Sequence, residues 1–441
     1  MDPISRVVLM SGSGPGFVPS GNGFIIEYGG TGSSNGYKLI HDLTTDSSGN
    51  IYICGEKDPD GNSHALVAKF NSSGVIQYQK DFDTYNGDFV FKSIHVDSSG
   101  NIHLGGSRRL SSVSTNAFQY TKLNSSFVEQ VQKDQYKNSA STTPEGVLID
   151  SSGNYYYFGK FSGDFWYSKV YGNDHSINTG KQYDTSLTTS QCLAAQMGTN
   201  GDTAITFYTL QYVPPNFLYK VGIGKLGSTG SVSFSKYVTT TNIHIPYAIT
   251  TDSSSNIYCA GQTDSQGTSD GWIIKTNSSG SVQWERYIGG SGSERFYSVK
   301  TDSSGNVYAV GTTNTGFSST MMLLVKYNSS GTLQWQRTFS YSGGLSNYRS
   351  GLDHRSSKIY VGGARGSGTN TAVVLALPDD GSETGSFYGY TYASSSLSNG
   401  SVSNTTGTLS LSGSTPSPQL TMADSLSTET TLSLGNQVKD I

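Results

Sequence analysis

Several kinds of residue are scarce in this chain of 441 residues, and each scarcity excludes a class of protein. Charged residues make up only 14% and the net charge is −4, so neither nucleic acid nor an anionic membrane surface is an expected partner. No apolar run has the length that spans a bilayer, and we therefore expect no membrane insertion. The opening MDPISRVVLMSGSG is too short in apolar residues for a signal peptide, which predicts synthesis and retention in a cytoplasm.

Cysteine is also scarce, and the residues that replace it point to a fold class. Cys54, Cys192 and Cys259 are an odd number and stand far apart, so we expect buried free thiols and not a disulfide framework. The chain is rich in Gly, Ser, Thr and Asn, which disfavour helices and favour turns. Its 29 Tyr and 18 Phe suit half-buried strands, and the composition predicts an all-β protein.

One short segment recurs along the chain with a nearly constant period. DSSGN stands at 46–50, 97–101, 150–154 and 302–306, DSSSN stands at 252–256, and an altered copy begins at Asp353. Adjacent copies lie 50 to 53 residues apart, and the double gap between 150 and 252 holds a degenerate unit, GTNGDTAITFYT, from Gly198. Seven units of this length are the signature of a circular or stacked repeat.

Each unit contains four strand-like segments joined by turn residues. DSSGN separates the first two segments, a variable loop follows, and NSSG separates the third from the fourth. An Asp or Asn side chain can accept a backbone hydrogen bond in such a turn, and Gly supplies the positive φ. The pattern predicts a seven-bladed β-propeller of four-stranded antiparallel blades, with a non-repeat N-terminal segment and an extended C-terminal tail.

The two ends of the chain do not repeat, and they suggest three regions. We expect an N-terminal attachment segment over 1–23, the propeller over 24–396, and a Ser/Thr/Gly-rich tail over 397–441. FIIEY, which opens the segment at 24–37, and GSFYGYTY at 385–392 are both candidates for the strand that closes blade 7. The tail has few large apolar residues, so we expect contact with another chain to order it.

The repeats resemble a known family. DSSGNVYAVGTT, LLVKYNSSGTLQWQRTF and YIGGSGSERFYSVKTDSSGN are similar to the Ser/Gly-rich seven-bladed propeller repeat of bacterial surface proteins and of tailed-phage virion proteins, cyanophages especially. The resemblance covers residues 24–396 and is strongest in units 1, 5 and 6. It implies a virion protein made in the host cytoplasm, and the family has no fixed catalytic residues to transfer.

Matches to catalytic and metal motifs are attributed to the repeat. GIGKLG at 222–227 lies in a strand with no helix after it, and GSSNG at 32–36 and GTSDG at 267–271 lie between strands. DPDGN at 58–62 lacks the distal Glu of a calcium loop. We therefore predict no catalytic residue, no cofactor and no metal site, although carboxylates from different blades could still converge across the ring.

The variable loops all fall on one face of the predicted propeller, opposite the DSSGN and NSSG turns. Polar, aromatic-bearing loops on a rigid scaffold are typical binding sites. The candidate ligand-binding residues on this face are Arg108, Arg109, Tyr212, Arg295, Tyr348 and Arg349.

These observations favour a structural and binding component of a virion tail, fibre or capsid exterior, and not an enzyme. Its expected partners are other virion structural proteins, bound through the termini, and a host-surface glycan. A purely structural spacer is a second interpretation of the same face. A secreted lectin-like adhesin and a propeller hydrolase or lyase are the alternative classes.

Overall fold

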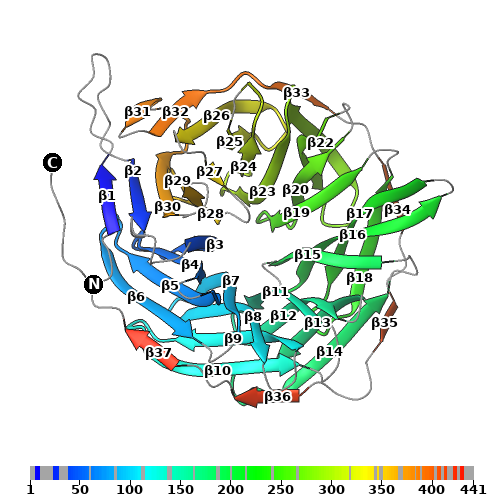
Figure 1. Cartoon of the computed structure of the whole chain (residues 1–441). Coiled ribbons are helices and arrows are strands. Elements are labelled where there is room, and N and C mark those ends of the chain that lie inside the picture. Colours follow the sequence, from blue (N-terminus) through cyan, green and yellow to red (C-terminus); the bar gives the residue numbers. More distant parts are fainter. Residues whose placement is uncertain are drawn as a thin grey trace.

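Seven antiparallel sheets stand around one axis in the computed structural model of the chain (Figure 1). The structure describes residues 5–9, 23–28, 38–58, 61–83, 87–110, 115–136, 142–161, 164–184, 189–198, 201–213, 216–239, 243–264, 268–316, 319–341, 345–346, 351–365, 371–382, 384–387, 390–401, 405–408, 412–414, 421–424 and 428–431. No helix occurs among these residues, and none could therefore cross a membrane as a helix. The predicted seven-bladed propeller of four-stranded blades is confirmed.

Each blade consists of four strands from the axis to the rim, which follow chain order in blades 1 to 6. The innermost strands of blades 1 to 7 are β3 (Lys38–Thr45), β7 (Phe89–Val96), β11 (Thr142–Ile149), β15 (Thr189–Met197), β19 (His244–Thr251), β23 (Glu294–Thr301) and β28 (Leu352–Arg355), the last preceded by β27 (Leu345–Ser346). The second strands are β4 (Ile51–Lys57), β8 (Ile102–Leu110), β12 (Tyr155–Phe161), β16 (Thr203–Val213), β20 (Ile257–Thr263), β24 (Val307–Thr313) and β29 (Lys358–Arg365).

The two outer positions of the blades complete the repeat. The third strands are β5 (His64–Phe70), β9 (Thr115–Leu123), β13 (Asp164–Val170), β17 (Asn216–Leu226), β21 (Asp270–Thr276), β25 (Met321–Tyr327) and β30 (Thr371–Pro378). The fourth strands are β6 (Ile76–Asp83), β10 (Glu129–Tyr136), β14 (Ile177–Asp184), β18 (Val232–Thr239), β22 (Val282–Gly289), β26 (Leu333–Tyr341) and, in blade 7, β2 (Phe24–Tyr28).

The recurring DSSGN segment is held together by its Asp side chain. Oδ1 of Asp46 accepts hydrogen bonds from the backbone N–H groups of Ser48 at 2.9 Å and Asn50 at 3.0 Å. Oδ2 accepts from Asn50 Nδ2 at 2.7 Å and from the Tyr52 hydroxyl at 3.0 Å, while Gly49 has a φ of 77°. The same Asn and backbone contacts recur at Asp97, Asp150, Asp252 and Asp302. The DSSGN segment therefore recurs because each copy forms a turn that the Asp carboxylate stabilises.

A second kind of contact joins blade 5 to blade 6 and blade 6 to blade 7. Trp284 in β22 donates from Nε1 to the carbonyl of Ser329 at 3.1 Å, and Arg286 donates from Nε to the carbonyl of Gly331 at 2.7 Å. A Cβ atom at Gly331 would lie 2.7 Å from the Trp284 ring, so glycine is required there. Trp335 and Arg337 of blade 6 repeat these contacts on blade 7. The Trp of the fourth strand in blades 5 and 6 thus has a structural role between blades.

The N-terminal strand closes the ring. β2 pairs with β30 as the fourth strand of blade 7, and Phe24 packs against Gly74 of blade 1 in the way that Trp284 packs against Gly331. GSFYGYTY, the other candidate, contributes β31 (Gly385–Phe387) and β32 (Tyr390–Ser394) beside β26 of blade 6. Of the two candidate strands, FIIEY is therefore the one that closes blade 7, and its pairing with β30 completes the ring.

The tail forms a belt around the rim, which the sequence did not predict. Its strands β33 (Ser398–Ser401), β34 (Thr405–Thr408), β35 (Ser412–Ser414), β36 (Thr421–Asp424) and β37 (Thr428–Thr431) pair with the fourth strands of blades 5, 4, 3, 2 and 1. β1 (Ser5–Leu9) takes the same outer place on blade 7 (Figure 1). These backbone pairings within the chain hold the described tail strands on the rim.

Two of the three cysteines can be described at the level of the side chain. Cys54 and Cys259 are free and buried, and burial raises the pKa of both thiols. Cys192 lies in β15, and its side chain is outside the described residues. The prediction of buried free thiols is confirmed for Cys54 and Cys259.

Candidate functional site

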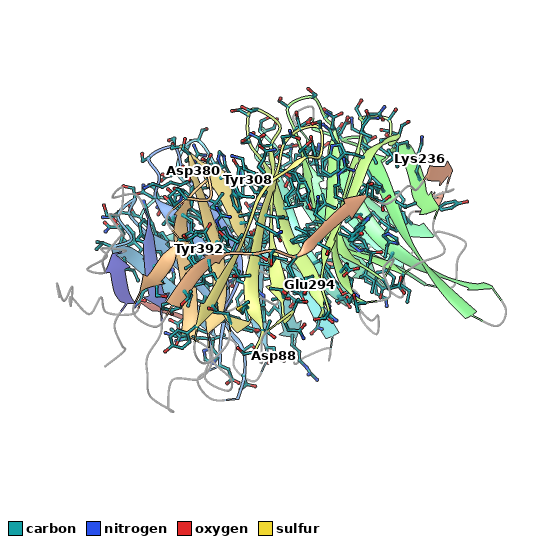
Figure 2. All side chains as sticks on the ribbon, turned by 90° about the horizontal axis from the view of Figure 1, so that it is seen from above. Asp88, Lys236, Glu294, Tyr308, Asp380 and Tyr392 are labelled. Atoms are coloured by element: carbon teal, nitrogen blue, oxygen red, sulfur yellow. The ribbon has the colours of Figure 1, made fainter. Side chains whose placement is uncertain are left out.

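The two faces of the propeller differ in what their side chains do. One face, called here the turn face, carries the DSSGN and NSSG turns, whose side chains bond within the turns themselves. The opposite face, called the variable face, carries the connections between second and third strands and between blades. Figure 2 shows Asp380 and Tyr308 toward the turn face and Asp88 at the variable face. The turn face is thus occupied by structural contacts.

A β-bulge recurs in the innermost strands. The ladder slips by one residue at the same place in blades 1 to 6, at His41, Lys92, Glu145, Leu193, Tyr247 and Tyr297, and of these the side chain of Leu193 is outside the described residues. A bulge redirects the side chain of the extra residue. Because these strands are nearest the axis, we infer that the five half-buried or buried side chains form a ring around it, on the half of the axis toward the variable face.

Blades 1 to 3 contribute charged side chains to this ring, and they pair with one another. His41 Nε2 lies 3.3 Å from Glu56 Oε1, and Lys92 Nζ lies 3.7 Å from Glu145 Oε2 and donates to the Pro144 carbonyl. Burial acts to raise the pKa of Glu56, but His41, with smaller contributions from Ser63 and Lys92, outweighs it and lowers that pKa. This side of the ring is held by its own ion pairs.

Blades 4 to 6 contribute an aromatic group, which we call the axial cradle. It consists of Tyr208, Tyr247, Gln262, Arg295 and Tyr297. The rings of Tyr247 and Tyr297 are 5.2 Å apart at 43°, and the Tyr247 hydroxyl donates to Gln262 Oε1 at 3.1 Å. Burial raises the pKa of Tyr247, Tyr297 and Tyr208 raise it further, and the positive charge of Arg295 opposes them. The cradle therefore holds the neutral phenol of Tyr247 beside one cation.

Of the six predicted site residues, Arg295 is the one whose described side chain lies in the axial cradle. It was expected in a loop between blades, but it is the second residue of β23 and pairs in register with Thr312. Tyr208, Tyr247 and Tyr297 were missed. The signal for the last two was a Tyr at the same position in HIPYAITT and ERFYSVKT, where alternation along the strand is broken.

Arg108 and Arg109 also lie in a strand and not in a loop. β8 continues to Leu110 because its hairpin with β9 is longer than the sequence suggested. Arg108 Nη1 lies 3.3 Å from Oδ2 of Asp134, which is buried, and Lys57 pairs with Asp81 at the same repeat position in blade 1. Arg108 thus has a structural partner, whereas Arg109 is exposed.

The remaining predicted residues lie at the edge of what the structure describes. Tyr212 was expected in a loop, but its backbone pairs with Phe217 in the hairpin of β16 and β17, and its side chain is outside the described residues. These strands have eleven residues each, and Figure 2 shows the hairpin projecting from the ring. Tyr348 and Arg349 lie between β27 and β28, outside the described residues.

Other groups that could suggest catalysis have structural roles. Asp270 and Glu294 are buried carboxyls of blades 5 and 6, and Glu294 Oε1 accepts hydrogen bonds from Thr313 at 2.6 Å and Thr315 at 2.7 Å. Burial, with help from Glu294, raises the pKa of Asp270 to about 6. In DPDGN, Asp58 accepts from the Gly61 N–H, as a turn does. Across the described residues, no three His, Cys, Asp or Glu side chains gather as metal ligands.

The architecture and the site together define a class of protein, a seven-bladed propeller built from one repeat. The chain is a β-propeller repeat protein, and the sequence model of the β-propeller repeat family SBBP matches residues 234–267. Among curated proteins, none matches the sequence.

Solved structures share the fold at low identity. The polysaccharide lyase Uly1 is similar with a TM-score of 0.50 and 8% identity, over 86% of this chain and 99% of the lyase. Sqt1 from Chaetomium thermophilum has a TM-score of 0.42 and 8% identity over 78% and 97% of the two chains. The tail fiber of Staphylococcus aureus phage P68 has a TM-score of 0.19 and 7% identity over 70% and 94%. The first likeness concerns the fold alone, and the other two carry no argument.

Proposed function

We propose that this chain is a structural and binding protein of a phage virion exterior, whose variable face contacts a host-surface glycan. The axial cradle is the observation that supports this proposal. Aromatic faces stack on sugar rings, and amide, hydroxyl and guanidinium groups hydrogen-bond sugar hydroxyls. Tyr247 and Tyr297 supply the faces, and Gln262 and Arg295 supply the polar groups.

Binding is favoured over cleavage by the state of the groups near the axis. The fold shared with a polysaccharide lyase makes cleavage the second candidate. Cleavage needs a base that can take a proton near neutral pH. Burial moves the pKa of Tyr247 away from that range, and Glu56 pairs with His41 and Glu145 with Lys92. Asp270, with a pKa of about 6, comes nearest to that range, but it is only 1% exposed, and Glu294 beside it is fully buried. A binding role needs none of these groups to titrate.

The virion role is supported by the resemblance of the repeats and by the position of the ends. β1 and β37 lie on the adjacent blades 7 and 1, so both ends of the described chain come to one sector of the rim (Figure 1). Attachment to neighbouring virion proteins through this sector would leave the variable face accessible. Quantitative mass spectrometry of purified virions tests this role, and absence of the chain from the particle would overturn it.

The glycan role is tested with one substitution in the cradle and one matched control. Tyr297→Leu removes an aromatic face and keeps an apolar side chain, and Tyr171→Leu makes the same change at an exposed residue on the turn side of blade 3. On an array of bacterial surface polysaccharides, we expect Tyr297→Leu to weaken binding about fivefold to tenfold and Tyr171→Leu to leave it unchanged. Equal binding by both variants would refute a glycan site in the cradle.

A further inference from the structure

Arg295 of the axial cradle is a cation for which the described residues offer no counterion. Its Nε is buried and has no hydrogen-bond partner within the described part of the chain. The other basic side chains near the axis differ: His41 faces Glu56, and Lys92 faces Glu145. A buried N–H without an acceptor costs free energy, and an anionic ligand at Arg295 would supply the acceptor that Nε lacks.

Lys300 lies five residues after Arg295 in the same strand, β23, and unlike Arg295 it has a carboxylate nearby. Burial raises the pKa of Asp42 to about 6, and Lys300 opposes this shift, which places the ammonium near that carboxylate. Arg295 instead affects the phenol of Tyr247. Among the described residues, no carboxylate pairs with Arg295.

We propose that the axial cradle binds an acidic sugar residue, whose ring stacks on Tyr297 or Tyr247 and whose carboxylate or sulfate pairs with Arg295. A planar guanidinium matches these anions with two parallel hydrogen bonds, which an ammonium group cannot do. The bulges hold the two Tyr side chains on adjacent blades, and Arg295 is fixed by the β23–β24 ladder two residues before Tyr297. This inference rests on the proposed glycan function and names its ligand class.

The test compares acidic sugars with their neutral counterparts. The probes are tetragalacturonate against galactotetraose, 3′-sialyllactose against lactose, and a sulfated carrageenan oligosaccharide against its desulfated form, titrated calorimetrically into the full chain. We expect at least one acidic probe to bind about tenfold more tightly than its neutral partner, with affinity falling as salt rises. Preference among the three acidic probes then distinguishes carboxylate from sulfate.

Three variants assign the preference to the cradle. Arg295→Gln should remove the acidic preference, and Arg295→Lys should restore it only in part because the paired hydrogen bonds are lost. Arg355→Gln makes the same change on the turn side of blade 7, where Arg355 bonds to Thr45, and should leave both affinities unchanged. Circular dichroism and unchanged unfolding midpoints would show that each variant is folded.

The outcomes separate this inference from the proposed function. Equal affinity for acidic and neutral probes would refute the acidic ligand while leaving a glycan function in place. Loss of the preference in Arg355→Gln, or its retention in Arg295→Gln, would refute the assignment to the cradle. Failure of every probe to bind would refute the acidic-sugar inference, and the polysaccharide array decides the function separately.

Discussion

Removal of the Phe24 ring tests whether the N-terminal strand closes the propeller. Phe24 is 4% exposed and belongs to the cluster of apolar side chains shared by blades 7 and 1. Its ring lies near Gly74, where an added Cβ would be 3.1 Å away. Deletion of a buried Phe side chain typically costs about 3–5 kcal/mol. We expect Phe24→Ala to cost about 3 kcal/mol, because part of the contact is with the edge of a turn.

An alanine substitution at the equivalent position in another blade is the internal control for closure. Trp284→Ala removes the corresponding ring between blades 5 and 6, where the chain itself continues from one blade to the next. Both variants should lose stability in denaturant unfolding. Only Phe24→Ala should also increase hydrogen exchange of β2 and β30, because β2 is held by pairing and packing alone.

An outcome in which Phe24→Ala costs less than about 0.5 kcal/mol would refute this account of closure. So would exchange protection that stays unchanged in β2 and β30. Either result would mean that another segment, such as GSFYGYTY, can take the fourth place in blade 7.

Two further predictions concern the turns and the belt. The turn aspartates have folded pKa values below the ordinary value of 3.8, about 2 for Asp97, despite burial that acts the other way; hydrogen bonds from Asn101 and His103 lower it. Their contribution to stability is therefore complete above pH 3.8 and is lost as the pH falls toward 2. The free energy of unfolding should fall over this pH range. In Asp97→Asn, which lacks one of these carboxylates, the free energy of unfolding should fall less over the same range. A variant with an unchanged acid transition would contradict that reasoning. Deletion of 402–441 removes β34 to β37 and uncovers the outer edges of β18, β14, β10 and β6; we expect concentration-dependent self-association in analytical ultracentrifugation, and a monomer at all concentrations would count against the belt as an edge cover.

The fold was predictable because its causes are local and repeat. Asp46 and its equivalents specify a turn within six residues, and the period counts the blades. Closure was not predictable, because FIIEY and GSFYGYTY have similar strand patterns. The choice depends on the contact of Phe24 in blade 7 with Gly74 in the adjacent blade 1. The belt was not predictable either, since its Ser, Thr and Gly residues pair through the backbone and show no apolar alternation.

The candidate site was only partly predictable for a different reason. Arg295 was identified as polar and near the variable face, but its strand position was not. Tyr247 and Tyr297 are 50 residues apart, and their contact depends on bulges in two blades. A one-residue bulge reverses which side chains face the axis, so the simple alternation used for strands assigns these residues to the wrong side.

The belt also fixes an order of events during synthesis. The tail covers blade 6 first and then blades 5, 4, 3, 2 and 1, which is the reverse of the order in which the ribosome makes them. Blade 1 is thus the first sheet to be made and the last of these six to receive its outer strand. Its edge at β6 stays open throughout elongation, and any chaperone or neighbouring nascent chain that recognises an unpaired strand has its longest opportunity there.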